Sequence, residues 1–321
     1  MKTVAFYSYK GGVGRSLFVA NLSLFLARFA AKKVLTVDLD LEAPGLHYKY
    51  EATGVVVPPI EAGLVDTLHD YLLAPEPPRT LPILDLWKGP DGGSVHFFPA
   101  GIAPRTAYWS TLGKMDFHAL MRDDEQKIGD LLFREVLLHI REQLDPDIVL
   151  VDARTGVTEL GGAAAQIWAQ QVFCMALDQP EHLEGSRAVM RGIARRRRTY
   201  GEGLIQVVPV LSRMHTVLGS PEEDAVRARV RGFLNEMGPT VEDTLSIESD
   251  DELVVLHNDD EVYRTGCVLM DDALQGALRP SRLLADYMEA GRLLLEPAEQ
   301  ADVSDRILSA GKADQEPLIA R

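Results

Sequence analysis

Residues 9–16 have the sequence YKGGVGRS and join a predicted buried strand to a predicted helix. The strand is the apolar run Thr3 to Tyr9, and the apolar spacing of a helix continues from Leu17 to Ala31. The three glycines permit backbone conformations that bring N–H groups close to phosphate oxygens, and a helix start adds unpaired N–H groups. This stretch therefore predicts a phosphate-binding loop.

The polar side chains of this loop have expected phosphate or metal contacts. Arg15 stands where phosphate loops usually carry Lys, Ser16 supplies a hydroxyl for Mg²⁺, and Lys10 adds a second cation. A guanidinium keeps the charge of Lys and can bind phosphate through two N–H groups, but it is bulkier and planar. We expect nucleotide binding to survive this exchange and hydrolysis to be slower. The loop residues predicted to bind nucleotide are Lys10, Gly11, Gly12, Val13, Gly14, Arg15, Ser16 and Leu17.

Acidic residues end two further predicted strands. The run Val34 to Asp38 continues as LDLEAPG, and the run Ile148 to Asp152 continues as ARTG. Ligands of open α/β sheets bind beyond the carboxyl ends of the strands, so Asp38, Asp40 and Asp152 are expected near Mg²⁺ and a terminal phosphate. Carboxylates suit a hard cation and can orient an attacking water. The alternative, turn residues that simply end a strand, is weaker in a chain that also carries a phosphate loop.

Together these three motifs resemble the ParA/MinD family of P-loop ATPases, with the deviant Walker A loop of the SIMIBI class, and in particular its K-G-G-V-G-R subgroup. They occur in the family's order, each at a strand end, and the similarity covers Met1 to about Leu211. The resemblance implies an ATPase with ATP and Mg²⁺ as cofactors. It implies metal ligation by Ser16, Asp38 and Asp152, and catalysis by Lys10, Asp40 and Asp152.

The resemblance also implies individual roles. Asp40 would orient or activate water, Asp152 would hold Mg²⁺ through a water, and Asp38 would support the nearby switch. Lys10 would reach the phosphates of the partner in a nucleotide-sandwich homodimer, the alternative being an exposed Lys beside the loop. Arg154 would either stabilise transition-state charge or form a salt bridge.

Base recognition is less specified. Relatives commonly carry an Asn after a late strand to bind adenine, and this chain has Ser212 and Arg213 there. Ser makes fewer hydrogen bonds than Asn, and an Arg can stack on a base. We therefore take Ser212 and Arg213 as the candidate base-binding residues.

Alternating patterns predict an α/β fold with a mainly parallel sheet and helices on both faces. One P-loop ATPase domain is expected over residues 1–296, with a surface excursion at Pro75 to Gly93 and a flexible C-terminal tail over residues 297–321. The remaining predicted strands are 95–99, 172–177, 205–211 and a candidate at 253–256, and the remaining predicted helices are 64–73, 128–143, 183–200, 221–237 and 280–295.

Composition bears on partners and compartment. The net charge of −15 disfavours general nucleic-acid binding, which depends on Lys and Arg neutralising phosphates. The cluster Arg195 to Arg198, with Arg187 and Arg191 at helical spacing, is better explained as a solvated helix face than as a DNA contact. The chain has no apolar run of about 18 residues and no signal peptide, so we expect a cytoplasmic protein. Cys174 and Cys267 lack metal-ligand spacing and are expected to be buried.

The leading hypothesis is a slow ATPase that switches between a monomer and an ATP-dependent homodimer to regulate an unidentified partner protein. The alternatives are a DNA-partitioning ATPase and a nucleotide sensor that does not hydrolyse ATP. No membrane anchor is evident, since Glu296 to Arg321 contains several acids and little apolar periodicity.

Overall fold

The computed structural model describes residues 1–73, 80–103, 105–117, 128–200, 205–236, 247, 252–265 and 282–313. Its centre is an eight-stranded sheet in the order β3-β4-β2-β5-β1-β6-β7-β8. Every neighbouring pair is parallel except β3 and β4. The strands are β1 (Lys2–Ser8), β2 (Lys33–Asp38), β3 (Leu84–Lys88), β4 (Ser94–Phe98), β5 (Ile148–Asp152), β6 (Gln171–Ala176), β7 (Gln206–Met214) and β8 (Val254–His257).

The predicted α/β class and parallel sheet are confirmed. The central strands are apolar on both faces and buried throughout, as expected when helices cover both sides of a parallel sheet. Sequence reasoning missed β3, which lies inside the predicted excursion Pro75 to Gly93. This strand pairs antiparallel with β4 at the sheet edge, is only partly buried and is interrupted by an irregularity between Asp85 and Trp87. Its apolar pattern is therefore weak.

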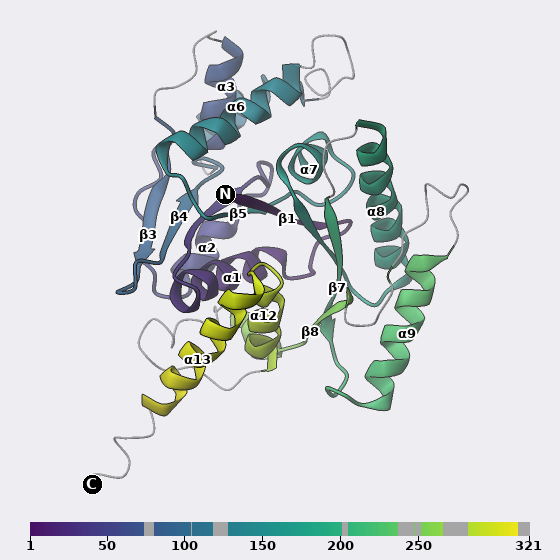
Figure 1. The fold of residues 1–321 in the computed structure, drawn as a ribbon. Coiled ribbons are helices and arrows are strands. Elements are labelled where there is room, and N and C mark those ends of the chain that lie inside the picture. Colours follow the sequence, from purple (N-terminus) through teal and green to yellow (C-terminus); the bar gives the residue numbers. More distant parts are fainter. Residues whose placement is uncertain are drawn as a thin grey trace.

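One face of the sheet is covered by helices from both ends of the chain. Figure 1 shows α12 and α13 beside α1, and the three helices are in contact. Phe18 of α1 stacks on Tyr287 of α12 with ring centroids 5.0 Å apart. A Cβ on Gly291 would lie 2.4 Å from the ring of Phe25, so this glycine permits the close approach of α12 to α1. These helices are α1 (Arg15–Phe29), α2 (Leu46–Glu51), α12 (Arg282–Arg292) and α13 (Pro297–Ala313).

Helices from the middle of the chain cover the other face. Trp168 is buried against Phe133, with ring centroids 5.5 Å apart, and its indole N–H donates to the Phe133 carbonyl at 2.6 Å. Cys174 is a buried free thiol in this layer, whereas Cys267 lies outside the described residues. These helices are α3 (Leu64–Leu73), α4 (Thr106–Leu112), α6 (Ile128–Gln143), α7 (Glu159–Ala163) with the π-turn η1 (Ala164–Trp168), α8 (Pro180–Tyr200) and α9 (Pro221–Asn235).

The C-terminal segment differs from its predicted form. Residues from Pro297 were expected to form a flexible tail, but α13 extends to Ala313. Val303 of this helix is buried, and Glu299 pairs with Lys32. Helix α13 buries few apolar side chains and has a mixed composition. Its sequence therefore lacks a clear helical pattern of apolar residues. The division into residues 1–296 and 297–321 stays a prediction.

Candidate nucleotide-binding site

Three strand ends converge on the glycine-rich loop. β1 runs between β5 and β6, and β2 lies on the other side of β5. The register pairs Phe6 with Asp152 and Asp38 with Asp152. Carboxyl ends of parallel strands meet at one edge of a sheet, so both aspartates lie beside the start of the loop. The predicted convergence of these motifs is thus present in the fold.

The loop forms an open cradle. Gly12 and Gly14 have φ angles of 82° and 85°, in the left-handed region that favours glycine. A Cβ on Gly11 or Gly12 would meet no atom within 4 Å. Among the hydrogen bonds of the described residues, none is donated by the backbone N–H groups of Gly11 to Gly14. Unpartnered N–H groups around empty space fit the oxygens of a phosphate.

The apolar members of the predicted loop set have a different position. Val13 and Leu17 are 1% and 4% exposed and pack into the core below the loop. They can therefore contact a ligand only through their backbones. Ser16, in the first turn of α1, is partly exposed, and Lys10 is exposed at the start of the loop.

The candidate base-binding residues support the loop from beneath. The hydroxyl of Ser212 is buried and donates to the Val13 carbonyl at 2.8 Å. Arg213 has a φ of 56° and places its guanidinium 4.5 Å from the ring centroid of Tyr263. One of its nitrogens lies 3.5 Å from the Gly12 carbonyl oxygen. An open cavity of about 500 Å³ borders Ser212 and Arg213 between the ends of β6 and β7 and the start of α9. Base binding by these residues stays a prediction.

Tyr263 was missed by sequence reasoning. It lies on α10 (Asp260–Thr265), and its ring covers Gly14 so closely that a Cβ there would lie 2.7 Å from Cε1. Burial raises the pKa of this phenol to about 12. No motif marks it, because its contact with the loop spans nearly the whole chain.

The sequence predicted that Arg15 binds phosphate in the cradle. In the structure its side chain also contacts acidic and hydroxyl groups beside the cradle. Its side chain is 6% exposed, and its Nε donates to Asp152 Oδ1 at 2.5 Å. Its two terminal nitrogens lie 3.2 Å from Asp40 Oδ2 and 3.2 Å from Ser8 Oγ. The guanidinium thus links the ends of β1 and β5 to the loop after β2. The carboxylates of Asp40 and Asp152 attract the guanidinium to this position. The loop motif alone does not reveal these contacts, because both acids lie elsewhere in the sequence.

Asp38 organises the loop that follows β2. One carboxyl oxygen accepts the N–H of Asp40 at 3.3 Å, and the other accepts those of Gly45 and Leu46, each at 3.1 Å. Burial, with the charge of Asp152, raises the pKa of Asp38 to about 8. Partial burial also raises the pKa of Asp40, and the guanidinium of Arg15 opposes that rise.

The expected metal ligands are not arranged as a metal centre. Asp38 is engaged by backbone N–H groups and Asp152 by Arg15. Within the part of the chain that the structure describes, no group of three His, Cys, Asp or Glu side chains could hold a metal ion. Of the three expected ligands, Ser16 is partly exposed, whereas Asp38 and Asp152 are buried. Metal ligation by Ser16, Asp38 and Asp152 stays a prediction.

The loop after β5 is fixed by polar contacts. Arg154 forms an ion pair with Glu42, so of its two expected roles the structure contains the salt bridge. The Tyr7 hydroxyl donates to the Gly156 carbonyl, and Gly156 has a φ of 82°. Thr158 caps α7 by accepting the Gly161 N–H at 3.1 Å. The loops after β2 and β5 are therefore joined to each other beside the cradle.

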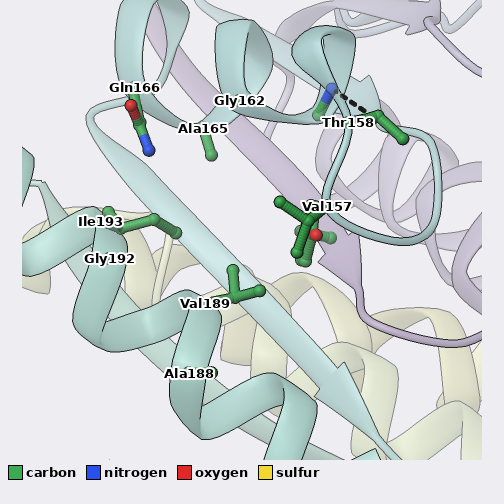
Figure 2. A pocket seen from close by; sticks show the side chains of 11 residues that line it. Val157, Thr158, Gly162, Ala165, Gln166, Ala188, Val189, Gly192 and Ile193 are labelled. Atoms are coloured by element: carbon green, nitrogen blue, oxygen red, sulfur yellow. Dashed lines mark hydrogen bonds between the residues drawn. The ribbon is translucent and has the colours of Figure 1, made fainter.

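A second hollow adjoins this loop. Figure 2 shows Val157 of the loop and Val189 and Ile193 of α8 around a pocket of about 210 Å³. Small residues of α7, η1 and α8, such as Gly162 and Gly192, also line it, together with Tyr7, Thr158 and Gln166. It has no cation and no phosphate cradle, so it is distinct from the nucleotide site.

Two of the basic residues of α8, Arg187 and Arg191, contact other groups of the fold. Arg187 stacks 4.0 Å from the ring centroid of Phe233 and pairs with Glu184 and Glu236. Arg191 donates to the Glu236 carbonyl. Arg195 to Arg198 lie on α8, but their side chains are outside the described residues.

Comparison with known proteins supports the fold independently. No protein-family profile matches the chain. A segment of 43 residues is 51% identical to the virulence plasmid ParA family protein pGP5-D of Chlamydia psittaci, covering 13% of this chain and only 17% of that protein. The septum site-determining protein MinD of Pyrococcus horikoshii, solved with Mg-ADP, has a TM-score of 0.59 at 16% identity and covers 92% of this chain and 97% of its own. A Cyanothece McdA–ATP complex has a TM-score of 0.57 at 15% identity with the same coverage.

These similarities confirm the predicted resemblance to ParA/MinD ATPases and the predicted P-loop fold. Within the described part of the chain, no helix combines the length and apolar character needed to cross a bilayer.

Proposed function

We propose that this chain is a ParA/MinD-type ATPase that binds ATP with Mg²⁺, hydrolyses it slowly and couples the nucleotide state to a homodimer that regulates a partner protein. The open cradle at Gly11 and Gly12 carries the proposal, because N–H groups without a protein partner around empty space suit an anionic group. The ligands of the structural neighbours, Mg-ADP in MinD and ATP in McdA, support the choice of nucleotide.

The residues around the cradle supply the remaining functions. Ser16 offers a hydroxyl to the ion that accompanies the nucleotide, and the N-terminal turn of α1 adds positive potential. Asp40 is 15% exposed, so it can reach a water molecule beyond the terminal phosphate. Lys10 is exposed at the start of the cradle, and in the proposed dimer it would reach the phosphates bound by the second copy. The bound ion would stabilise negative charge on the phosphates.

A nucleotide sensor that does not hydrolyse ATP is the second candidate. The contact between Arg15 and Asp40 favours it, because a carboxylate engaged by a guanidinium is a poorer base for water. A DNA-partitioning role has less support. Arg187 and Arg191 are engaged by neighbouring groups of the fold, and the net charge is −15.

Binding of a non-hydrolysable ATP analogue to Gly11→Val tests the proposal. A Cβ at residue 11 meets no protein atom within 4 Å, so the fold should be retained while the added side chain fills space for phosphate. Calorimetry should show saturable binding to the parent and to Gly232→Val, the same change at another open glycine on α9, and none to Gly11→Val. Equal binding by all three proteins would remove the basis of the site. Phosphate release by the parent then separates the ATPase from the sensor.

A further inference from the structure

Arg15 lies between acidic side chains at the carboxyl ends of β2 and β5. It contacts Asp152, Asp40 and Ser8 with three separate nitrogens while remaining 6% exposed. These acceptors come from β5, from the loop after β2 and from β1. A cation that joins three chain segments through oxygen atoms is positioned as a bound divalent ion would be.

The guanidinium has capacity left for a ligand. It carries five N–H donors in a rigid plane, of which the three contacts use three. The contacts to Asp152, Asp40 and Ser8 therefore leave two N–H groups of Arg15 unused. A guanidinium suits such planar, multiple contacts, whereas a Lys ammonium is a compact charge on a flexible stem.

The partners of the three aspartates also differ. The carboxyl oxygens of Asp38 accept backbone N–H groups. Asp40 and Asp152 instead have the guanidinium of Arg15 as their cationic partner. Loss of Arg15 without a replacement cation would leave these carboxylates unpaired, which is costly.

We propose that Arg15 takes the place of the divalent cation between Asp152, Asp40 and the terminal phosphate of the nucleotide, so that nucleotide affinity depends little on Mg²⁺. This inference rests on the proposed nucleotide binding. It leaves Mg²⁺ free to accompany the nucleotide through phosphate oxygens and Ser16, but assigns neutralisation of the two carboxylates to the protein itself.

Calorimetric titration of the full chain with a non-hydrolysable ATP analogue, in excess Mg²⁺ and again in excess EDTA, tests the inference. The dissociation constant of the parent should change less than about threefold between the two conditions. In Arg15→Lys the ammonium cannot make all three contacts, so removal of Mg²⁺ should weaken binding by about tenfold or more. Arg306→Lys is the control, since Arg306 is exposed on α13 and pairs with Asp91 away from the cradle.

The outcomes separate this inference from the function on which it rests. A parent that binds the analogue only with Mg²⁺ overturns the role of Arg15 while leaving nucleotide binding intact. A parent that binds the analogue in neither condition overturns both. Because the parent alone decides the first result, the inference stays testable if Arg15→Lys fails to fold.

Discussion

Asp38 and Asp152 are paired in register as the last residues of β2 and β5, and their exposed fractions are 0% and 1%. Two carboxyl groups this close in a buried setting cannot both ionise without cost. Asp152 has the guanidinium of Arg15 as its counter-charge, whereas Asp38 has backbone N–H groups. Burial, with the charge of Asp152, raises the pKa of Asp38 to about 8.

Asp38 should make stability depend on pH. Its pKa is raised by burial to about 8 from the model-compound value of 3.8, so between these values the folded chain holds a proton that the unfolded chain has lost. The free energy of unfolding should therefore fall as pH rises through this window and level off above it. Urea unfolding at several pH values should show this slope in the parent and in the surface variant Asp302→Asn, and a shallower slope in Asp38→Asn. Identical slopes in all three would contradict the assignment.

Gly14 and Gly11 should respond differently to alanine. Gly14 has a φ of 85° and its Cβ would lie 2.7 Å from the Tyr263 ring, whereas a Cβ on Gly11 meets nothing within 4 Å. Gly14→Ala should lose about 1–3 kcal/mol of stability from backbone strain and crowding. Gly11→Ala should unfold like the parent in thermal denaturation. If Gly14→Ala were equally stable, Tyr263 would not cover the loop in solution.

Asp40 should affect turnover more than binding. Asp40→Ala should retain affinity for an ATP analogue and lose about 10²- to 10⁴-fold in phosphate release, if its carboxylate acts on water in the transition state. Calorimetry measures the first quantity and single-turnover phosphate release the second. Asp302→Ala, at an exposed position of α13, is the control. If Asp40→Ala released phosphate as fast as the parent, Asp40 would have only a structural role, through its contact with Arg15.

Lys10 should affect assembly more than affinity. The side chain is exposed at the loop, so in a two-fold dimer each copy would supply one charge to the phosphates of the other. Light scattering should detect a dimer of the parent with the ATP analogue but not with ADP. Lys10→Ala should dimerise less while binding the analogue, and Lys88→Ala, exposed on the edge strand β3, should match the parent. A parent that stays monomeric at saturating analogue would refute the sandwich dimer.

Strong local patterns explain what sequence reasoning found. The central strands are apolar runs, and the glycines and aspartates that follow them belong to the same short stretches of chain, so the phosphate loop and the strand ends could be placed together. Weak local patterns explain what it missed. β3 is a half-buried edge strand, and α13 buries few apolar side chains.

The sequence by itself determined the α/β architecture, the loop at residues 9–16 and the meeting of Asp38 and Asp152 at one sheet edge, because strand periodicity and parallel connections leave little freedom there. Only the tertiary structure decided where the long polar side chains go. Arg15 turns towards Asp152, 137 positions away, and Arg213 stacks on Tyr263, which covers Gly14. Such choices depend on burial and on charges brought together from distant segments, and no local spacing encodes them.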